Sequence, residues 1–273
     1  MRSFAQVDVF TTEPGLGNPV AVVLDGSGLS TEAMQRFAAW TNLSETTFVL
    51  PPSGEADYRV RIFTPTSELP FAGHPTIGTC WAVLDAGLVK PTDGAVTQEC
   101  AAGLVPLTVT DGVVTFTAPV AEIRPEPGGL DELAEALSGV RPHAPTLVNA
   151  GPPWLTARVT PAELDSLTID SGLLLRLFAE HGWDLTLYAV DADDVVHVRS
   201  FFPTDALVED PVCGSGNVAV AAHRRATAGF TGAYASRQGS HRGRDGHLAV
   251  SVDADAIRVG GRAVTVVRGT VAI

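Results

Sequence analysis

The sequence predicts an α/β protein (α+β-like) made of two lobes that are built alike. Residues 59–63 alternate polar and apolar side chains, as a half-buried strand does. Pro65, Pro70 and Pro75 interrupt the following stretch, which is expected to be a fixed loop, and a helical apolar pattern begins at the last of them. The same order of strand, loop and helix returns over residues 196–229, roughly 140 residues later. A unit used twice, half a chain apart, indicates two similar lobes.

The helix of the first copy is expected to begin near Pro75 and to stop at Gly87. Gly73 and His74 then lie at its N-terminus, where free backbone N–H groups and the helix dipole favour an anion. Its apolar positions follow the i, i+3, i+4, i+7 rule at Ile77, Cys80, Trp81, Leu84 and Leu88.

The second copy has the same parts. A rigid loop over residues 205–213 leads to Gly214 and Ser215, and an Ala/Val-rich helix follows that stops at Gly229. Two helix starts, each introduced by a polar loop, predict a site for a small carboxylate.

The rest of the first lobe is mostly strand. Residues 3–10 and 19–24 have strand patterns, and Ser30 is expected to cap a helix over residues 31–40. Glu45 directly precedes an apolar strand over residues 46–50, a position where burial can tune the pKa of a carboxylate.

Further strands are expected at residues 104–110 and 113–118, joined by the hairpin signal Asp111-Gly112. The stretch 119–129 is rich in proline and acidic residues, and we place the lobe boundary there. The lobes are therefore predicted to cover residues 1–118 and 119–262, with the strand 263–273 as a candidate to complete the first lobe.

In the second lobe, Thr160 and Glu163 form a capping box at a helix start, and further helices are expected at residues 130–137 and 173–178. A constant offset of about 140 residues aligns Leu185 with Glu45, which leaves Glu45 without a carboxylate counterpart in this lobe.

Composition excludes several classes of function. The net charge of −13 argues against a nucleic-acid or anionic-membrane surface, and no apolar run has the length of a membrane span. Three cysteines without paired spacing predict a reducing compartment, the cytoplasm. No metal-ligand motif and no nucleotide-binding glycine motif occurs, so we expect no metal and no cofactor.

Four motifs in the chain carry a resemblance to a known family: VDVFTTEPGLGNPVAVV at the N-terminus, NLSETTFVL around Glu45, RIFTPTSELPFAGHPTIGT around His74 and VEDPVCGSGN around Asp210. Gln238-Gly239 with Gly243-Arg244 adds a weaker match. In this order they resemble the PhzF-like isomerases of phenazine biosynthesis. That resemblance implies the diaminopimelate epimerase fold, in which each lobe is a mixed β-sheet wrapped around a central helix.

The resemblance also implies the site. Glu45 would be the general acid/base that moves a proton, with His74 and Asp210 as further catalytic residues that orient the substrate and adjust its charge. The two helix N-termini would hold the substrate carboxylate. The residues expected to bind the substrate are Ser44, Gly73, Gly214, Ser215, Cys213 and Asn18.

Cys213 departs from the family, which has threonine before this Gly-Ser pair. The related diaminopimelate epimerases carry a catalytic cysteine in the same Cys-Gly-Ser-Gly context, although their other cysteine would fall at Ala72. Cys213 is therefore either a small buried substitute for threonine or a second base, since a thiol at a helix N-terminus is expected to have a lowered pKa. Cys80 and Cys100 are expected to be core residues.

The predicted function is an isomerase that shifts a proton by a 1,3- or 1,5-shift on a small unsaturated or cyclic carboxylate metabolite. We expect it to serve bacterial specialised-metabolite biosynthesis of the antibiotic or phenazine type and to act as a homodimer. Two alternatives remain open: a racemase or epimerase of amino-acid type that uses Glu45 and Cys213, and a non-catalytic protein that binds small acids.

Overall fold

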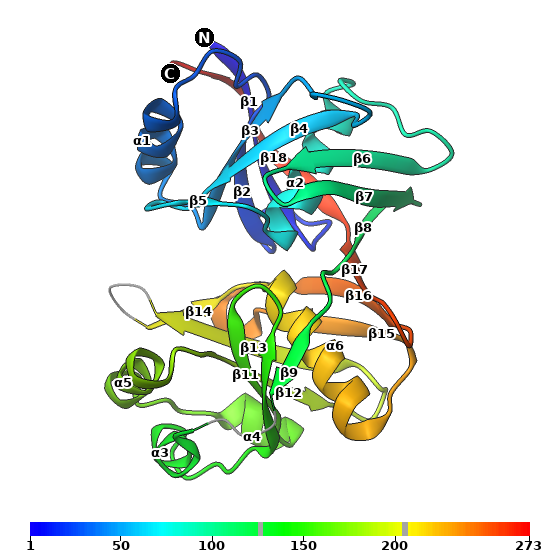
Figure 1. Ribbon diagram of the computed structural model, residues 1–273. Coiled ribbons are helices and arrows are strands. Elements are labelled where there is room, and N and C mark those ends of the chain that lie inside the picture. Colours follow the sequence, from blue (N-terminus) through cyan, green and yellow to red (C-terminus); the bar gives the residue numbers. More distant parts are fainter. Residues whose placement is uncertain (125–127, 204–206) are drawn as a thin grey trace. The chain divides into compact units, whose positions relative to one another are not determined.

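A computed structural model of the chain describes residues 1–124, 128–203 and 207–273. The chain divides into two compact units. Unit 1 comprises Met1–Thr117 together with the C-terminal Gly260–Ile273, and unit 2 comprises Ala118–Val259. The last strand of the chain therefore belongs to the unit that contains the first (Figure 1).

Unit 1 is a strongly curved, mixed β-sheet. β1 is central to it, because it pairs antiparallel with both β2 and the C-terminal β18. β2 runs parallel to β3, and β3 pairs antiparallel with β4. The strands of unit 1 are β1 (Arg2–Val9), β2 (Asn18–Val23), β3 (Glu45–Leu50), β4 (Tyr58–Phe63), β5 (Glu68–Leu69), β6 (Ala95–Cys100), β7 (Gly103–Thr110), β8 (Val113–Thr117) and β18 (Ala263–Val271).

The central helix of unit 1 is α2 (Gly73–Asp85), and the strands surround it (Figure 1). Its burial on almost every side explains its apolar sequence, which includes the fully buried Ile77 and Cys80. A second helix, α1 (Thr31–Thr41), begins at the Ser30 cap as expected and packs Met34 and Phe37 on the other side of the sheet. Leu88, expected on the apolar face, instead follows the helix and is exposed.

Unit 2 repeats this plan around α6 (Gly214–Ala228). Its other helices are α3 (Leu130–Ala136), α4 (Pro161–Ser166) and α5 (Ser171–His181), and the Thr160–Glu163 capping box is formed. Its strands are β9 (Glu122–Arg124), β10 (His143–Asn149), β11 (Pro153–Arg158), β12 (Asp184–Val190), β13 (Val196–Pro203), β14 (Leu207–Asp210), β15 (Gly232–Gln238), β16 (Gly246–Val252) and most of β17 (Ile257–Gly261).

Two stretches predicted to be loops contain short strands. β5 lies between Pro65 and Pro70 and pairs with β4, which is possible because neither Glu68 nor Leu69 is a proline and both keep a backbone N–H group. β14 lies within the stretch 205–213 and pairs with β13. Asp205, at the start of that predicted loop, lies outside the described residues.

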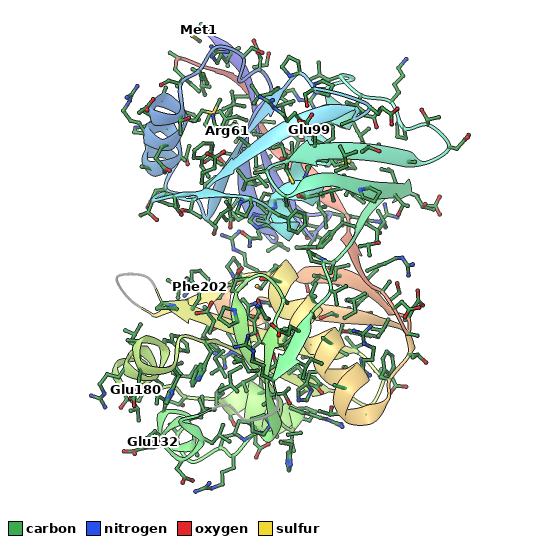
Figure 2. The ribbon with its side chains drawn as sticks, in the orientation of Figure 1. Met1, Arg61, Glu99, Glu132, Glu180 and Phe202 are labelled. Atoms are coloured by element: carbon green, nitrogen blue, oxygen red, sulfur yellow. The ribbon has the colours of Figure 1, made fainter. Side chains whose placement is uncertain are left out.

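An ion pair repeated in both units fixes how the two copies align. In unit 1, Arg61 of β4, labelled in Figure 2, pairs with Glu68 and lies over the ring of Phe63 at 5.1 Å. In unit 2, Arg199 of β13 pairs with Glu209 and lies over the ring of Phe201 at 5.2 Å.

The strands that pair with the two arginine strands, β3 with β4 and β12 with β13, then show which residue of unit 2 corresponds to Glu45. Phe48 lies opposite Arg61 in register, and Leu187 lies opposite Arg199. Counting three residues back along each strand places Asp184, and not Leu185, at the position of Glu45. The alignment at a constant offset was wrong because the connection between the preceding helix and this strand is one residue shorter in unit 2.

We predict that Gly78→Ala destabilises the protein by about 1–3 kcal/mol, because a Cβ at this position in α2 would collide with Val20 of β2 and with Val9 of β1 at 2.8 Å. This cost outweighs the gain in helix propensity of up to about 1 kcal/mol. The free energy of unfolding in urea measures it. Gly54→Ala is the control, since open space surrounds Gly54 and its stability should change by less than about 0.5 kcal/mol. Equal stabilities of the two variants would contradict the packing described for α2.

Candidate active site

Glu45 and His74 meet in unit 1 where a strand and the central helix both begin. Glu45 is the first residue of β3, and His74 is the second residue of α2. The Nδ1 atom of His74 lies 3.3 Å from Oε2 of Glu45, and their side chains are only 7% and 16% exposed. The structure therefore brings together two of the three predicted catalytic residues.

Burial controls the protonation of His74. Removal of the ring from water lowers the pKa of His74 to about 4, and the backbone of Pro19 opposes this change. The Glu45 carboxylate also favours an imidazolium, but the geometry does not require one, because a neutral imidazole still carries one N–H donor. A neutral His74 can thus lie against the Glu45 carboxylate without neutralising it.

The start of α2 is open to an anionic group. Its N-cap is Ala72, whose side chain cannot accept a hydrogen bond from the first backbone N–H groups. Gly73 is required there because a Cβ would come within 2.8 Å of the Phe116 ring. The backbone N–H groups beside His74 are therefore not covered by a capping side chain, which is the arrangement that binds carboxylates and phosphates.

The two other predicted residues of unit 1 lie on the same strand ends. Asn18 is buried at the start of β2, the strand that runs parallel to β3. Ser44 is exposed and directly precedes Glu45. Both positions are compatible with substrate contacts, and their roles stay predictions.

In unit 2, Asp210 and Cys213 lie just before α6. Asp210 ends β14, and its Oδ1 accepts a hydrogen bond from the N–H of Val212 at 3.0 Å. Burial raises the pKa of Asp210 to about 6. Cys213 is the N-cap of α6, where its Sγ accepts from the N–H of Gly216 at 3.2 Å and lies 3.5 Å from Oγ of Ser215.

The expected thiolate character of Cys213 is contradicted. Burial raises the pKa of Cys213 well above its usual value, and the neighbouring Asp210 carboxylate raises it further. Both effects outweigh the helix N-terminus, which favours the thiolate. Cys213 is therefore protonated near neutral pH.

Gln238 is a site residue whose role the sequence analysis missed. Its Oε1 accepts from the N–H of Cys213 and from Nδ2 of Asn217, each at 3.1 Å. Its Nε2 donates to the carbonyl of Asp210 at 3.0 Å. Gln238 thus fixes the loop between Asp210 and α6. The Gln238-Gly239 motif was the available signal, but nothing in it showed which residues the amide would bind.

A pocket of about 370 Å³ in unit 2 is lined by none of the predicted site residues, although Gln238 is part of its lining. It contains two acid–histidine contacts, His197 with Asp191 at 2.7 Å and His241 with Asp165 at 3.8 Å. Both histidines already have carboxylate partners. Its lining comprises Pro161, Leu164, Asp165, Asp191, His197, Val198, Arg199, Arg237, Gln238, Ser240, His241 and Asp245.

Comparison with known proteins decides the family. The model of the phenazine biosynthesis-like family, PhzC-PhzF, matches residues 7–269. The chain belongs to this family. Its resemblance to the PhzF-like isomerases is thus confirmed, and so, at the level of the family, is the expectation of an enzyme.

Similar proteins occur in several organisms. The chain is 38% identical to a Schizosaccharomyces pombe protein named antisense-enhancing sequence 1, over 98% of both chains. It is 55% identical over 83 residues, 30% of each chain, to trans-2,3-dihydro-3-hydroxyanthranilate isomerase of Pseudomonas aeruginosa. A PhzF-family crystal structure from Bacillus anthracis superposes with a TM-score of 0.87 at 25% identity, covering 100% of this chain and 99% of the other.

The predicted fold class is confirmed by more distant structures. A probable proline racemase from Agrobacterium radiobacter superposes with a TM-score of 0.70 over 100% of this chain and 93% of its own, at 18% identity. The chain therefore shares its fold with this structure. Among the helices described, none is long and apolar enough to cross a membrane. Within the described parts of the chain, no three His, Cys, Asp or Glu side chains are placed to hold a metal ion.

We predict that His74 titrates well below the ordinary histidine pKa of about 6.5, because its ring is buried. The unfolded chain protonates this residue near pH 6.5, so the His74 contribution to stability is present above that pH and is lost as pH falls toward 4. Imidazole resonances in a proton NMR titration measure the pKa, and His74→Gln assigns them. A pKa at or above 6.5 would show that the ion pair with Glu45, and not burial, controls the ring.

Proposed function

We propose that the protein is an isomerase that moves a proton along the carbon skeleton of a small carboxylic acid, with Glu45 as the acid–base group. The observation that carries this proposal is the Glu45–His74 contact of 3.3 Å beside an uncapped helix start. The backbone N–H groups at the start of α2 would bind the substrate carboxylate, and Glu45 would accept a proton a short distance away.

The reaction needs few steps. The Glu45 carboxylate removes a proton from a carbon next to an unsaturated bond, and the electron pair shifts along the conjugated system. Protonated Glu45 then returns the proton to the carbon at the far end, so that one double bond moves and Glu45 is regenerated. Neutral His74 lies 3.3 Å from the carboxylate and does not neutralise it. The backbone N–H groups at Gly73 bind the substrate carboxylate and stabilise negative charge that develops during the shift.

The name of one relative supports an unsaturated or cyclic substrate. The P. aeruginosa relative is named for such a compound, a dihydroanthranilate, and the part of the chain that matches it is 55% identical. We extend the proposal to a metabolite of antibiotic or phenazine-type biosynthesis, to a homodimeric assembly and to action in the cytoplasm. Three free cysteines support a reducing compartment.

We predict that Glu45→Gln lowers turnover by about 10²–10⁴-fold, because the amide keeps the shape of the side chain but cannot transfer a proton. Binding of the substrate should change little. The assay follows the loss of the substrate chromophore and the exchange of its protons in heavy water, with trans-2,3-dihydro-3-hydroxyanthranilate as the first candidate.

Glu55→Gln is the matched control, since Glu55 is an exposed glutamate in a surface loop of the same unit. It should retain wild-type turnover. Near-normal turnover in Glu45→Gln would remove Glu45 from the mechanism. Binding without turnover or proton exchange in the wild type would instead support the alternative of a non-catalytic binding protein.

A second candidate function, stereoinversion, rests on Cys213. The Cys213-Gly214-Ser215-Gly216 sequence matches the context of an epimerase cysteine, and the structure places the thiol at the start of α6. A protonated thiol can serve as the donor in an inversion, although its raised pKa makes the reverse step, proton removal by the thiolate, unfavourable.

Cys213→Thr separates the two candidates. For a one-base isomerase, we predict a change in turnover of less than about threefold, because threonine is the usual family residue and its hydroxyl can still cap Gly216. For an epimerase, a threonine hydroxyl is too weak an acid–base group, and turnover should fall by several orders of magnitude. Circular dichroism verifies folding. A collapse of activity in a folded variant would favour the epimerase.

A further inference from the structure

The pocket of about 370 Å³ lies wholly within unit 2 and has the size of a site for a small molecule. Its walls come from α4, from the strands β13 and β15, and from the short 3₁₀ helix η1 (Ser240–Arg242). Neither Glu45 nor His74, the residues of the proposed proton transfer, lines it. The pocket therefore has no role in the function described so far.

Hydrogen bonds hold the walls of this pocket in place. The buried Arg199 of β13 donates from Nη1 to the carbonyls of Leu164 and Leu167, at 3.2 and 3.4 Å, and so fixes the end of α4 against the sheet. His241 of η1 contacts α4 as well, because its Nε2 lies 3.0 Å from the carbonyl of Asp165. The pocket is thus preformed, and a ligand does not have to order its walls on binding.

Arg237 lies at the centre of a row of basic side chains that crosses three strands. His197 of β13 and His247 of β16 both lie opposite Arg237 of β15 in register, so the three side chains share one face of the sheet. Each histidine has an acid beside it: Nε2 of His197 lies 2.7 Å from Oδ2 of Asp191, and Nε2 of His247 lies 3.0 Å from Oδ1 of Asp245. Arg237 has no such acid, since no hydrogen bond or ion pair joins its side chain to the parts of the chain that the structure describes.

The internal repeat shows what unit 1 has at the position of Arg237. Two residues before the arginines of the repeated ion pairs, Arg59 of β4 corresponds to His197 of β13. Glu99 of β6, labelled in Figure 2, lies opposite Arg59 in the same way that Arg237 lies opposite His197. Hydrogen bonds from Ser53 and the charge of Arg59 lower the pKa of Glu99, so this position of unit 1 carries a carboxylate. Unit 2 has a cation in the same place.

We propose that the pocket is a second ligand site, which binds a small anion with one carboxylate or phosphate group through the guanidinium of Arg237. A guanidinium can donate two parallel hydrogen bonds to either group. The ligand brings the negative charge that Glu99 provides within unit 1. Asp165 and Asp191 also line the pocket, and their charges repel a ligand with several negative groups. This site does not depend on the proposed reaction, whose carboxylate site is at the start of α2 in unit 1.

An NMR titration of the ¹⁵N-labelled protein tests the proposal, because it reports where an anion binds. The two probes are sodium acetate and inorganic phosphate, at an ionic strength held constant with sodium chloride. We expect at least one probe to shift the backbone amides of Arg237 and Ser240 and the side-chain amide of Gln238, with a response that saturates. A response to acetate alone assigns a carboxylate ligand, and a response to phosphate alone assigns a phosphate ester.

Substitutions of Arg237 show whether the guanidinium binds the anion. Arg237→Gln should weaken binding of the probe by about tenfold or more, because it removes hydrogen bonds between charged groups. Arg237→Glu puts into unit 2 the carboxylate that unit 1 has, and it should abolish binding. Arg242→Gln is the matched control, since Arg242 is an exposed arginine of η1 outside the lining, and it should leave binding unchanged.

Thermal unfolding separates ligand binding from a structural role of Arg237. Its side chain has no partner to lose, so the melting temperature of Arg237→Gln should lie within about 2 °C of the wild-type value. A much lower melting temperature would show that Arg237 supports the fold, and would overturn the inference.

Three other results would also overturn it: no response of these resonances to either probe, shifts confined to the start of α2, and binding that survives in Arg237→Gln. Glu45→Gln should bind the probe at this pocket as the wild type does. A pocket that binds the probe in a protein without turnover would therefore leave this inference standing while the proposed function fails.

Discussion

The contact between Glu45 and His74 depends on how closely the buried start of α2 can approach the first residue of β3. α2 can occupy the centre of its unit only because Gly78 accommodates Val9 and Val20, and because Gly73 accommodates Phe116. The same packing removes the imidazole of His74 from water and keeps it neutral. A charged histidine would neutralise the Glu45 carboxylate, which we propose as the proton acceptor. The packing around α2 therefore also sets the protonation state of His74.

The internal repeat shows how one scaffold carries two chemistries. Both units place an arginine–glutamate pair on the same two strands and begin a central helix at a glycine, yet His74 in one corresponds to Ser215 in the other. The carboxylates Glu45 and Asp184 also correspond, but only Glu45 has a histidine beside it. The repeated parts set the positions of the side chains, and the residues that differ decide which of the two carboxylates lies beside a histidine.

Much of the fold could be predicted from local signals. The Ser30 cap and the Thr160–Glu163 capping box each act over a few residues, and both formed as expected. The alignment of Glu45 with Leu185 failed because it assumed a constant offset, whereas register depends on pairing between distant strands. The ion pairs across β4–β5 and β13–β14, together with the pairing of each arginine strand with its neighbour, reveal it.

The electrostatics of the site were harder to predict. The helix start at Cys213 favours a thiolate, but burial and the charge of Asp210 raise the pKa of the thiol more strongly. The sequence alone shows neither how deeply Cys213 is buried nor how near Asp210 lies. In the same way, the amide of Gln238 holds three groups of the α6 loop that are over twenty residues away from it in the chain. The pKa of a buried group depends on such long-range contacts, which periodicity and spacing do not report.

The central claim is that one carboxylate both removes and returns the proton, and label tracking within single turnovers tests it most directly. A substrate that carries deuterium at the donor carbon is converted in ordinary water, and mass spectrometry of the product locates the label. The account predicts that a measurable share of the deuterium appears at the acceptor carbon of the same molecule, since Glu45 carries it there while shielded from solvent. Transfer of no label in the first turnover, with the acceptor proton drawn entirely from water, would contradict a single-base mechanism.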